Sequence, residues 1–428
     1  MTKIALVTYG TRGDVSPFTA TGLELQSRGH DVVVAAPLNH VAFIEKSGLS
    51  ARPLAGDSEA LMTSGNGRRW LASGGISTML RELNTLIRDL TPQVTRDVEV
   101  AIEDADVVVT GLLTADICRL LLDKKPGPTL VIGHACPTLP SSSFQNALLD
   151  LPMPHVLNKV SSQAVWKFVW WLMGDIANSE RRRRGLPLAP QDAATWHQKN
   201  GGLSLHLWSP AMLPRPVDWG DNDVVTGFCG LPKTARNSLG ESAALLDLEA
   251  FIAAGPAPFF IGLGSMPILD EGAMLRLVVD VATRLRRRVI LGGSWTDRAA
   301  VQQRLPAALV RVCSAVDHDA LFPRCVGVLH HGGAGSTATS VRAGVPTMIA
   351  AVLGDQHFWG RLLVQLGVGS FVRFQDLDSQ RLFQGLSTLL LPQVQQRARE
   401  LGTAMRAEDG PVIAANAIEA AARRQSSA

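Results

Sequence analysis

The residues from 4 to 36 constrain the fold more than any other part of the chain. Residues 4–9 form an apolar run typical of a buried strand, and they lead into the turn Gly10-Thr11-Arg12-Gly13-Asp14. Ser16-Pro17 then has the pattern of a helix start, Gly29 that of a helix end, and residues 31–36 that of a second strand. Because a parallel pair of strands needs a crossover of this kind, the segment predicts a βαβ unit in a parallel sheet.

The same alternation of strands and helices continues along the chain and restarts in its second half. A proline-rich stretch without clear periodicity, residues 209–232, separates the two halves. The further elements that we expect are strands at 107–110, 129–133, 259–264, 289–291, 326–331 and 346–352, and helices at 155–184 and 273–286. A chain of 428 residues suits two domains, so the sequence predicts two doubly wound α/β units.

The composition excludes several classes of protein. With 46% hydrophobic and 18% charged residues, the chain is too apolar to be disordered. The 41 basic and 38 acidic residues give a net charge of +3, which offers no electrostatic case for binding nucleic acid. The five cysteines form no CxxC pair, which indicates a reducing, cytoplasmic compartment. We expect neither a signal peptide nor a transmembrane helix, because no apolar run is long enough.

The most informative local motif is His330-His331-Gly332-Gly333-Ala334-Gly335-Ser336-Thr337, which follows a predicted strand and opens a helix. Ligands of open α/β sheets bind at the carboxyl ends of strands. Three glycines let backbone N–H groups approach a ligand closely, and the start of the helix, which we expect Ser336 to cap, favours an anion. A diphosphate fits this turn, although a tight turn requires glycine for its dihedral angles in any case.

Neither the adjacent histidines nor the acidic strings of the chain indicate a metal site. His330 and His331 are successive strand residues, so we expect one to face the ligand and the other to pack. DxD strings, which hold a divalent metal in some sugar transferases, occur three times, at Asp104/Asp106, Asp317/Asp319 and Asp376/Asp378. A string that recurs in this way is unspecific, and Asp317 and Asp319 have the position of helix-start residues. We therefore assign no metal.

Three further groups of residues have both a functional and a structural interpretation. Asp14 lies at the carboxyl edge of the first sheet, where a role in catalysis and a role in offsetting the helix dipole are equally consistent with the sequence. Asp355-Gln356 follows a predicted strand and offers the carboxylate and amide that bind sugar hydroxyls, or simply a polar loop. The tryptophans in residues 166–171 are more typical of core than of a ligand platform.

Together these segments resemble the family 1 nucleotide-sugar glycosyltransferases, and most of all the branch of sterol glucosyltransferases and bacterial enzymes that glycosylate antibiotics and lipids. The resemblance covers nearly the whole chain, and its segments are Gly10 to Pro17, Arg28-Gly29-His30, Phe260 to Pro267, Ala315 to His318 with Leu321-Phe322-Pro323, and His330 through Gly344-Val345-Pro346 to Asp355-Gln356. It implies the GT-B fold, in which two Rossmann-like domains face each other across a cleft. The implied domains are an acceptor-binding domain at 1–230, a nucleotide-sugar-binding domain at 231–405, and a helical segment at 406–428 that packs back on the first domain.

The resemblance also implies the residues of a donor site. His330 and Ser265 would contact the diphosphate together with the turn, and Asp355 and Gln356 would bind sugar hydroxyls. Val316 would meet the nucleobase through its backbone. Ser314 stands where plant relatives carry a tryptophan that stacks on uracil, and Trp295 is therefore assigned to the base or to the acceptor. The implied donor-binding residues are Ser265, Trp295, Val316, His330, Gly332, Gly333, Gly335, Ser336, Asp355 and Gln356.

On the acceptor side, the resemblance makes Asp14 the general base, at a position where many relatives carry histidine. Asp116, His134 and Trp170 are candidates for binding the acceptor. The implied reaction is inverting transfer of a hexose from a UDP- or dTDP-sugar to a hydroxyl or amine of an apolar molecule such as a sterol, lipid or natural-product aglycone. No cofactor or metal is expected, and the tryptophan-rich segment is a candidate for peripheral membrane contact. The alternatives are a nucleotide-sugar epimerase or hydrolase, and a silent accessory protein that binds a nucleotide sugar.

Overall fold

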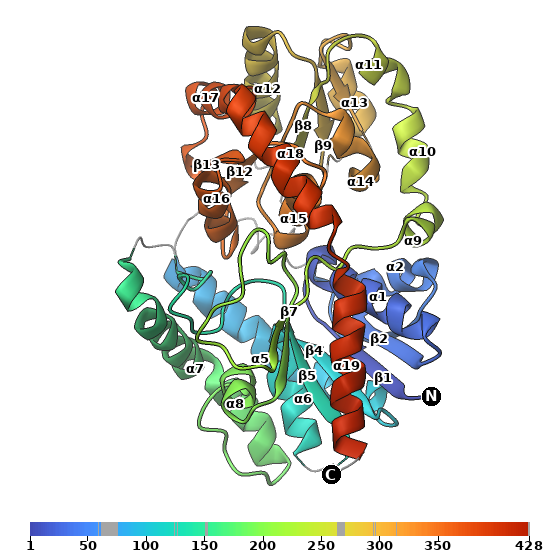
Figure 1. The fold of residues 1–428 in the computed structure, drawn as a ribbon, viewed down its shortest axis with the longest axis vertical. Coiled ribbons are helices and arrows are strands. Elements are labelled where there is room, and N and C mark those ends of the chain that lie inside the picture. The colour runs from blue at the N-terminus through green and yellow to red at the C-terminus, as the bar shows by residue number, and fades with distance from the viewer. Residues whose placement is uncertain are drawn as a thin grey trace. The chain divides into compact units, whose positions relative to one another are not determined.

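The computed structural model describes residues 1–58, 60, 76–123, 125, 127–149, 153–262, 270–293, 295, 297–313 and 315–426. They form two compact α/β units (Figure 1). Unit 1 holds the described parts of Met1–Ala60, Ser73–Pro232 and Asp409–Ala428, and unit 2 holds those of Lys233–Glu408. Each unit has its own parallel sheet with helices on its faces.

Unit 1 is built on a seven-stranded sheet with the order β3-β2-β1-β4-β5-β6-β7, in which every neighbouring pair is parallel. The strand order reverses between β1 and β4, which are the topological switch point of the sheet. Its elements are β1 (Lys3–Val7), α1 (Arg12–Ser27), β2 (Asp31–Pro37), η1 (Leu38–His40), α2 (Val41–Ser47), β3 (Ser50–Leu54), α5 (Ile76–Ala101), β4 (Val107–Gly111), η2 (Leu112–Thr114), α6 (Ala115–Leu122), β5 (Thr129–His134), η3 (His155–Leu157), α7 (Asn158–Arg183), α8 (Ala193–Lys199), β6 (Leu203–His206), β7 (Asp223–Val225) and α19 (Gly410–Ser426).

Unit 2 repeats this plan on a six-stranded parallel sheet with the order β10-β9-β8-β11-β12-β13. Here the strand order reverses between β8 and β11. Its elements are α9 (Lys233–Ser238), α10 (Glu241–Leu246), α11 (Glu249–Ala253), β8 (Phe259–Gly262), α12 (Glu271–Leu285), β9 (Val289–Gly292), α13 (Arg298–Gln303), β10 (Val310–Val312), α14 (His318–Leu321), η4 (Phe322–Arg324), β11 (Gly327–His330), α15 (Ala334–Arg342), β12 (Thr347–Ala351), α16 (Gln356–Gln365), β13 (Gly369–Arg373), η5 (Phe374–Asp376), α17 (Ser379–Leu389) and α18 (Pro392–Arg406).

The helix α19 belongs to unit 1 although it ends the sequence. It packs along α1 and touches β5 and β6 (Figure 1, red). Arg28, at the end of α1, donates a hydrogen bond of 2.7 Å to the side-chain oxygen of Asn416 and forms an ion pair with Glu419 at 3.3 Å. His30 lies 3.0 Å from the same glutamate. The last helix is therefore held to the first by apolar packing and by a small polar cluster.

Two predicted helix starts were wrong. The helix α1 begins at Arg12 rather than near Ser16, because Thr11 and Asp14 form a capping box that satisfies its first N–H groups. Pro17 consequently lies inside the helix. The second error concerns α15, which begins at Ala334 with Gly333 at its N-cap, so Ser336 lies within the first turn and does not cap the helix.

The remaining predicted elements are present in the part of the chain that the structure describes, with ends that differ by a few residues. Three of the predicted strands correspond to β1, β4 and β5, and the long predicted helix corresponds to η3 with α7. The predicted strand at 259–264 is β8 as far as Gly262, and the rest of it lies outside the described residues. Four of the five cysteines are buried and all five are free thiols, as expected of small core residues. No described helix is long and apolar enough to cross a bilayer.

Candidate active site

The turn after β1 places the carboxylate of Asp14 over the backbone of Gly10. Asp14 Oδ2 accepts hydrogen bonds from the backbone N–H of Thr11 at 2.8 Å and from its hydroxyl at 3.2 Å. Gly10 has φ +138°, and a Cβ on this residue would lie 2.3 Å from Asp14 Oδ2. Only glycine therefore leaves room for the carboxylate at this place, and the turn fixes where the acid points.

The environment of Asp14 makes its carboxylate a stronger base than the carboxylate of an exposed aspartate. Burial raises the pKa of the Asp14 carboxyl, and the hydrogen bonds from Thr11 oppose that rise in part. A raised pKa brings a carboxylate closer to the basicity that proton transfer from an alcohol requires. Asp14 thus caps the helix and also carries a carboxylate of raised pKa at the carboxyl edge of the sheet.

A buried histidine that the sequence analysis did not single out holds the same turn from its other side. His40 is 3% exposed, and its Nε2 lies 3.2 Å from the carbonyl oxygen of Gly10 and 3.2 Å from the hydroxyl of Ser58. Asn39 approaches the same nitrogen at 3.3 Å. His40 thereby ties the loop after β2 to the turn that carries Asp14. No sequence signal identified it, because it stands in no glycine-rich motif.

The turn after β11 uses its two histidines differently from our expectation. His330 is 2% exposed; its Nδ1 accepts from the backbone N–H of Gly332 at 2.9 Å, and its Nε2 lies 3.3 Å from the hydroxyl of Ser340. Since Nδ1 accepts, the ring carries its proton on Nε2, and burial lowers its pKa well below the usual value. Both ring nitrogens of His330 are thus used, one by the turn and the other by Ser340 of α15. The assignment of His330 to the diphosphate is not supported by this geometry.

His331 has the opposite environment. Its ring lies over Gly333, where a Cβ would come within 2.7 Å of Nε2, so the imidazole follows the start of α15. Its Nδ1 is buried without a partner among the described residues. Burial lowers the pKa of His331 to about 4, so the ring is neutral near pH 7 and has one N–H to donate. Of the two histidines, His331 is the one whose hydrogen-bonding capacity is left for a ligand.

Among the described residues, no side chain caps the first turn of α15. Gly333 provides no side-chain cap, and the turn contains no acidic residue. Within the described part of the chain, no side chain accepts from the N–H groups of Ala334, Gly335 or Ser336. Thr337 directs its hydroxyl back to the carbonyl oxygen of Gly333 at 3.0 Å. Free N–H groups and an uncompensated helix dipole make this terminus suitable for an anion.

The loop after β12 lies directly against this turn. A Cβ on Gly332, which has φ +94°, would lie 2.6 Å from Ile349 and 3.3 Å from the Cβ of Gln356. Gln356 is buried, and its Oε1 accepts from the N–H groups of Val352 and Leu353 at 2.7 and 3.1 Å. Its side chain therefore shapes the loop after β12. The structure thus brings the His331 turn and Gln356, which are far apart in sequence, into one site at neighbouring strand ends.

Asp355 is less free than its sequence position indicated. It stands at the N-cap of α16, and its Oδ2 accepts a hydrogen bond of 2.8 Å from the indole N–H of Trp359. That bond fixes the direction of the carboxylate. A carboxylate oriented in this way at a strand end can pair with hydroxyl groups.

Of the other predicted donor residues, Trp295 and Val316 follow the neighbouring strands β9 and β10, and Ser265 lies outside the described residues. Trp295 follows β9 and is 7% exposed; its indole N–H has no partner among the described residues and lies over Gly293. Val316 is also buried and packs in the apolar cluster around Phe322. Ser265 and Ser314 lie outside the described residues.

The three acceptor candidates are not brought together by a common contact. Asp116 accepts a hydrogen bond of 2.7 Å from the backbone N–H of Ala193, and this bond joins α6 to the start of α8. Burial raises the pKa of Asp116 to about 6. His134 is 1% exposed and stacks on His206, with ring centroids 5.1 Å apart. Trp170 is half-buried on α7. Asp116 thus has a backbone partner and His134 a stacking partner, while Trp170 is partly exposed.

Two of the three DxD strings contribute a residue that caps a helix. Asp317 caps α14 by accepting from the N–H of Asp319 at 3.0 Å, which confirms the helix-start interpretation of this pair. Asp378 caps α17 in the same way. Among the residues that the structure describes, no group of three or more His, Cys, Asp or Glu side chains has the arrangement of a metal site.

With this geometry in view, comparisons with known proteins identify the family. The Glycosyltransferase family 28 N-terminal domain matches residues 4–108, and the Erythromycin biosynthesis protein CIII-like C-terminal domain matches residues 276–420. An uncharacterised glycosyltransferase of Mycobacterium leprae is 31% identical over 432 residues, which are 99% of this chain and 98% of that protein. The chain is a family 1 glycosyltransferase of the GT-B fold. A sterol 3-beta-glucosyltransferase of Arabidopsis thaliana is also 31% identical to this glycosyltransferase, over 97% of the chain and 67% of the plant protein.

Solved structures of glycosyltransferases share its fold at low sequence identity. The glycotransferase of kitacinnamycin is 19% identical and superposes with a TM-score of 0.71, over 98% of both chains. The glycosyltransferase VinC, solved in complex with dTDP, is 17% identical with a TM-score of 0.67, over 99% of this chain and all of that one. Both show that the two parallel-sheet units of this glycosyltransferase form a GT-B architecture.

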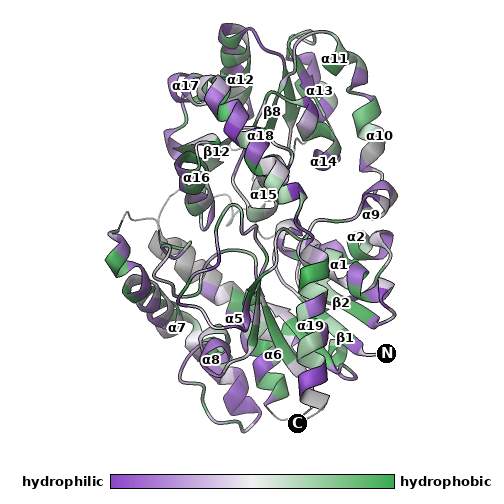
Figure 2. Cartoon of the chain, viewed as in Figure 1, coloured by the Kyte–Doolittle hydropathy of each residue, from purple (hydrophilic) through white to green (hydrophobic). Residues whose placement is uncertain are grey.

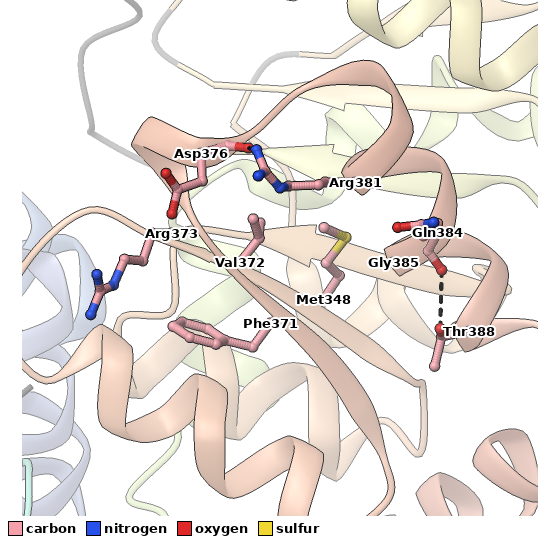
Figure 3. A pocket seen from close by; sticks show the side chains of 9 residues that line it. All are labelled: Met348, Phe371, Val372, Arg373, Asp376, Arg381, Gln384, Gly385 and Thr388. Atoms are coloured by element: carbon pink, nitrogen blue, oxygen red, sulfur yellow. Dashed lines mark hydrogen bonds between the residues drawn. The ribbon is translucent and has the colours of Figure 1, made fainter. Parts of the chain in front are cut away.

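Two hollows that lie within single units of this glycosyltransferase are distant from both glycine turns. One, of about 450 Å³, opens in unit 2 between β13 and α17 and is drawn in Figure 3. There Arg381 turns toward Asp376, whose carbonyl oxygen it contacts at 2.5 Å, while Arg373 points away from the other labelled side chains. The other, of about 920 Å³, lies at the amino ends of β1 and β5 beside α19. Neither is lined by a residue that we assigned to the site.

Proposed function

We propose that this glycosyltransferase moves a hexose from a UDP- or dTDP-sugar to a hydroxyl or amine of an apolar small molecule, by a single displacement that inverts the anomeric carbon. The observation that carries the proposal is the contrast between its two strand–turn–helix sites. One holds a carboxylate of raised pKa at the switch point of its sheet, and the other presents an uncapped helix terminus at the switch point of the second sheet.

In the proposed reaction, Asp14 takes the proton of the acceptor while the acceptor oxygen or nitrogen attacks the anomeric carbon. The bond between that carbon and the diphosphate oxygen breaks, and the electron pair leaves with the nucleoside diphosphate. The growing negative charge is stabilised by the free N–H groups of α15 and by the neutral imidazole of His331, which donates a hydrogen bond. This arrangement supports transfer without a metal ion, since the helix terminus supplies the electrostatic stabilisation.

The rest of the donor would lie along the neighbouring strand ends. We assign sugar hydroxyls to Asp355, whose carboxylate is oriented by Trp359, and to the amide nitrogen of Gln356, whose oxygen is already used. Trp295 and the backbone of Val316 are assigned to the base side of the donor. The bound dTDP of VinC and the sterol glucosyltransferase relatives support a nucleotide-sugar donor and leave both uracil and thymine as bases.

The acceptor is proposed to be an apolar molecule such as a sterol, a lipid or a natural-product aglycone. The sterol glucosyltransferase of Arabidopsis and the antibiotic glycosyltransferase structures support this class. Trp170 is the aromatic side chain that we place against the acceptor, because it is half-buried and so presents an apolar surface with one side open. Trp170→Ala should then raise the KM for the acceptor several-fold, whereas the neighbouring Trp171→Ala should leave it unchanged for a water-soluble aglycone.

The experiment that tests the proposal measures the release of nucleoside diphosphate from UDP-glucose and from dTDP-glucose, with and without a panel of sterol and polyketide aglycones. We expect release that depends on an acceptor, and a β-linked product from the α-linked donor by NMR of the anomeric proton. Equal release in the absence of any acceptor would identify a hydrolase instead. A product of retained configuration would remove Asp14 as a base in a single displacement.

A further inference from the structure

A row of apolar side chains lies exposed along η3 and α7 of unit 1. Its large members are Val156, Val160, Phe168 and Trp171, which are 86%, 62%, 53% and 76% exposed. Their spacing of four, eight and three residues keeps them on one side of the helix over about four turns. Figure 2 shows hydrophobic positions at the N-terminal end of α7. Single exposed apolar residues are ordinary, but a row of them over this length marks an interaction surface.

The tryptophans of α7 divide between the core and this row. Trp166 is 8% exposed, and its indole N–H donates to the carbonyl oxygen of Thr138 at 2.7 Å, which fixes the inner face of the helix. On the outer face the rings of Phe168 and Trp171 stack on each other with their centroids 5.9 Å apart. The exposed aromatic pair is therefore held in place by a helix whose orientation is set from the inside.

The segment that carries the row contributes basic side chains and no acidic ones. From Pro154 to Gly174 the sequence contains no aspartate or glutamate and two lysines, Lys159 and Lys167. Both lysines are exposed; Lys159 pairs with Asp218 at 3.1 Å, and Lys167 has no ion-pair partner among the described residues. The first acid on the helix is Asp175, which already lies 3.1 Å from Arg88 and from Arg182. Of the two lysines beside the apolar row, Lys167 thus carries a positive charge without an ion-pair partner among the described residues, while Lys159 is paired with Asp218.

We propose that this face of η3 and α7 docks on an anionic lipid surface, with the helix lying in the plane of the interface and Phe168 and Trp171 entering the boundary between headgroups and acyl chains. Aromatic side chains favour that depth, and lysines beside them are attracted to anionic headgroups. The helix lies on the bilayer and does not cross it, in agreement with the absence of a membrane-crossing helix among the described residues. The proposal is independent of the donor and acceptor chemistry, because it concerns binding alone.

The experiment uses the full chain and sucrose-loaded vesicles of phosphatidylcholine, either pure or with about 30% phosphatidylglycerol. The anionic lipid is included because it supplies the electrostatic part of binding. We expect the protein to sediment with the anionic vesicles and to be released as salt shortens the Debye length. The double variant Phe168→Ser/Trp171→Ser should bind at least about tenfold more weakly, and Lys167→Glu should weaken binding several-fold at low salt.

The matched control is Val217→Ser, which changes a residue of unit 1 that is 91% exposed on another segment, and it should bind like the wild type. Release of nucleoside diphosphate with a water-soluble aglycone should be equal in all variants, which shows that they are folded. The proposal is overturned if the wild type ignores anionic vesicles, or if the double variant binds them equally well. A dimer in size-exclusion chromatography that the double variant abolishes, without vesicle binding, would assign the row to a second copy of the chain.

Discussion

After β1 and after β11 the chain passes through the same sequence of local structures. A buried strand ends, a glycine adopts a positive φ of +138° at Gly10 or +94° at Gly332, and a helix begins within a few residues. The third residue of each helix differs, since it is Asp14 in α1 and Ser336 in α15. In α1 the carboxylate and Thr11 satisfy the first N–H groups, while in α15 no side chain of the described residues caps the terminus.

In the proposed function, this difference lets one architecture serve two electrostatic purposes. At the start of α1 the carboxylate of Asp14 already offsets the positive end of the helix dipole, so this terminus has little attraction for another anion. The carboxylate itself is the group that we propose as the base. A terminus without a protein cap keeps its free N–H groups for a ligand. The predictions below exchange or remove the groups that make the two turns different.

The largest effect should come from Asp14→Asn, which keeps the shape of the capping box and removes the base. Turnover should fall roughly a hundredfold to ten-thousandfold while donor affinity and melting temperature hold, because asparagine can still accept from Thr11. In the wild type, turnover should fall as the pH drops through the raised pKa of Asp14, since only the deprotonated acid accepts a proton. Steady-state kinetics across pH tests this; near-normal turnover in the variant would leave Asp14 with the cap alone.

The second effect separates the two histidines of the β11 turn. His331→Ala should lower turnover about a hundredfold with little change in melting temperature, because it removes a donor to the leaving group. His330→Ala should instead destabilise the fold by about 1–3 kcal/mol, because the N–H of Gly332 and the hydroxyl of Ser340 lose their buried partner. Kinetics and thermal melts on both variants decide the matter, and the reverse pattern would return the diphosphate contact to His330.

A smaller effect is expected when the acid of the first turn is copied into the second. Ser336→Asp puts a carboxylate at the position in α15 that Asp14 occupies in α1, where it should reach the backbone N–H groups of the turn. Donor affinity should fall about tenfold through like-charge repulsion, while the helix gains about 0.3–1 kcal/mol from the dipole. Ser336→Asn is the uncharged control for calorimetric titration with UDP and dTDP. An unchanged affinity in the Asp variant would place the diphosphate elsewhere.

The smallest effect should come from chelation. If the uncapped terminus of α15 and neutral His331 stabilise the leaving charge, EDTA should leave the rate within about twofold of its untreated value. Burial keeps the pKa of His331 near 4, so this contact should also stay constant between pH 6 and 8. Loss of activity on chelation that magnesium or manganese restores would show that the helix terminus does not act alone.

Most of the central strands were predicted from sequence, whereas the central strand β6 and the edge strands were not. The strands β1, β4, β8 and β11 are buried on both faces and appear as continuous apolar runs. The missed strands include all four edges, β3, β7, β10 and β13. An edge strand is exposed to solvent along one side. The strand β3 has the sequence SARPL, and of its residues only Leu54 is buried. Its pairing therefore depends on the neighbouring strand rather than on its own pattern.

The sequence by itself determined the fold class, the positions of both glycine turns and the family, because glycine turns at strand ends and apolar strands are local signals. Only the tertiary structure decided which residues of those turns remain available. The sequence does not distinguish His330 from His331. In the structure, Nε2 of His330 hydrogen-bonds to Ser340, ten residues away, whereas Nδ1 of His331 has no partner among the described residues. His40 likewise reaches Gly10 from thirty residues away. Such contacts depend on how strands and helices pack, which the residues of a turn do not encode.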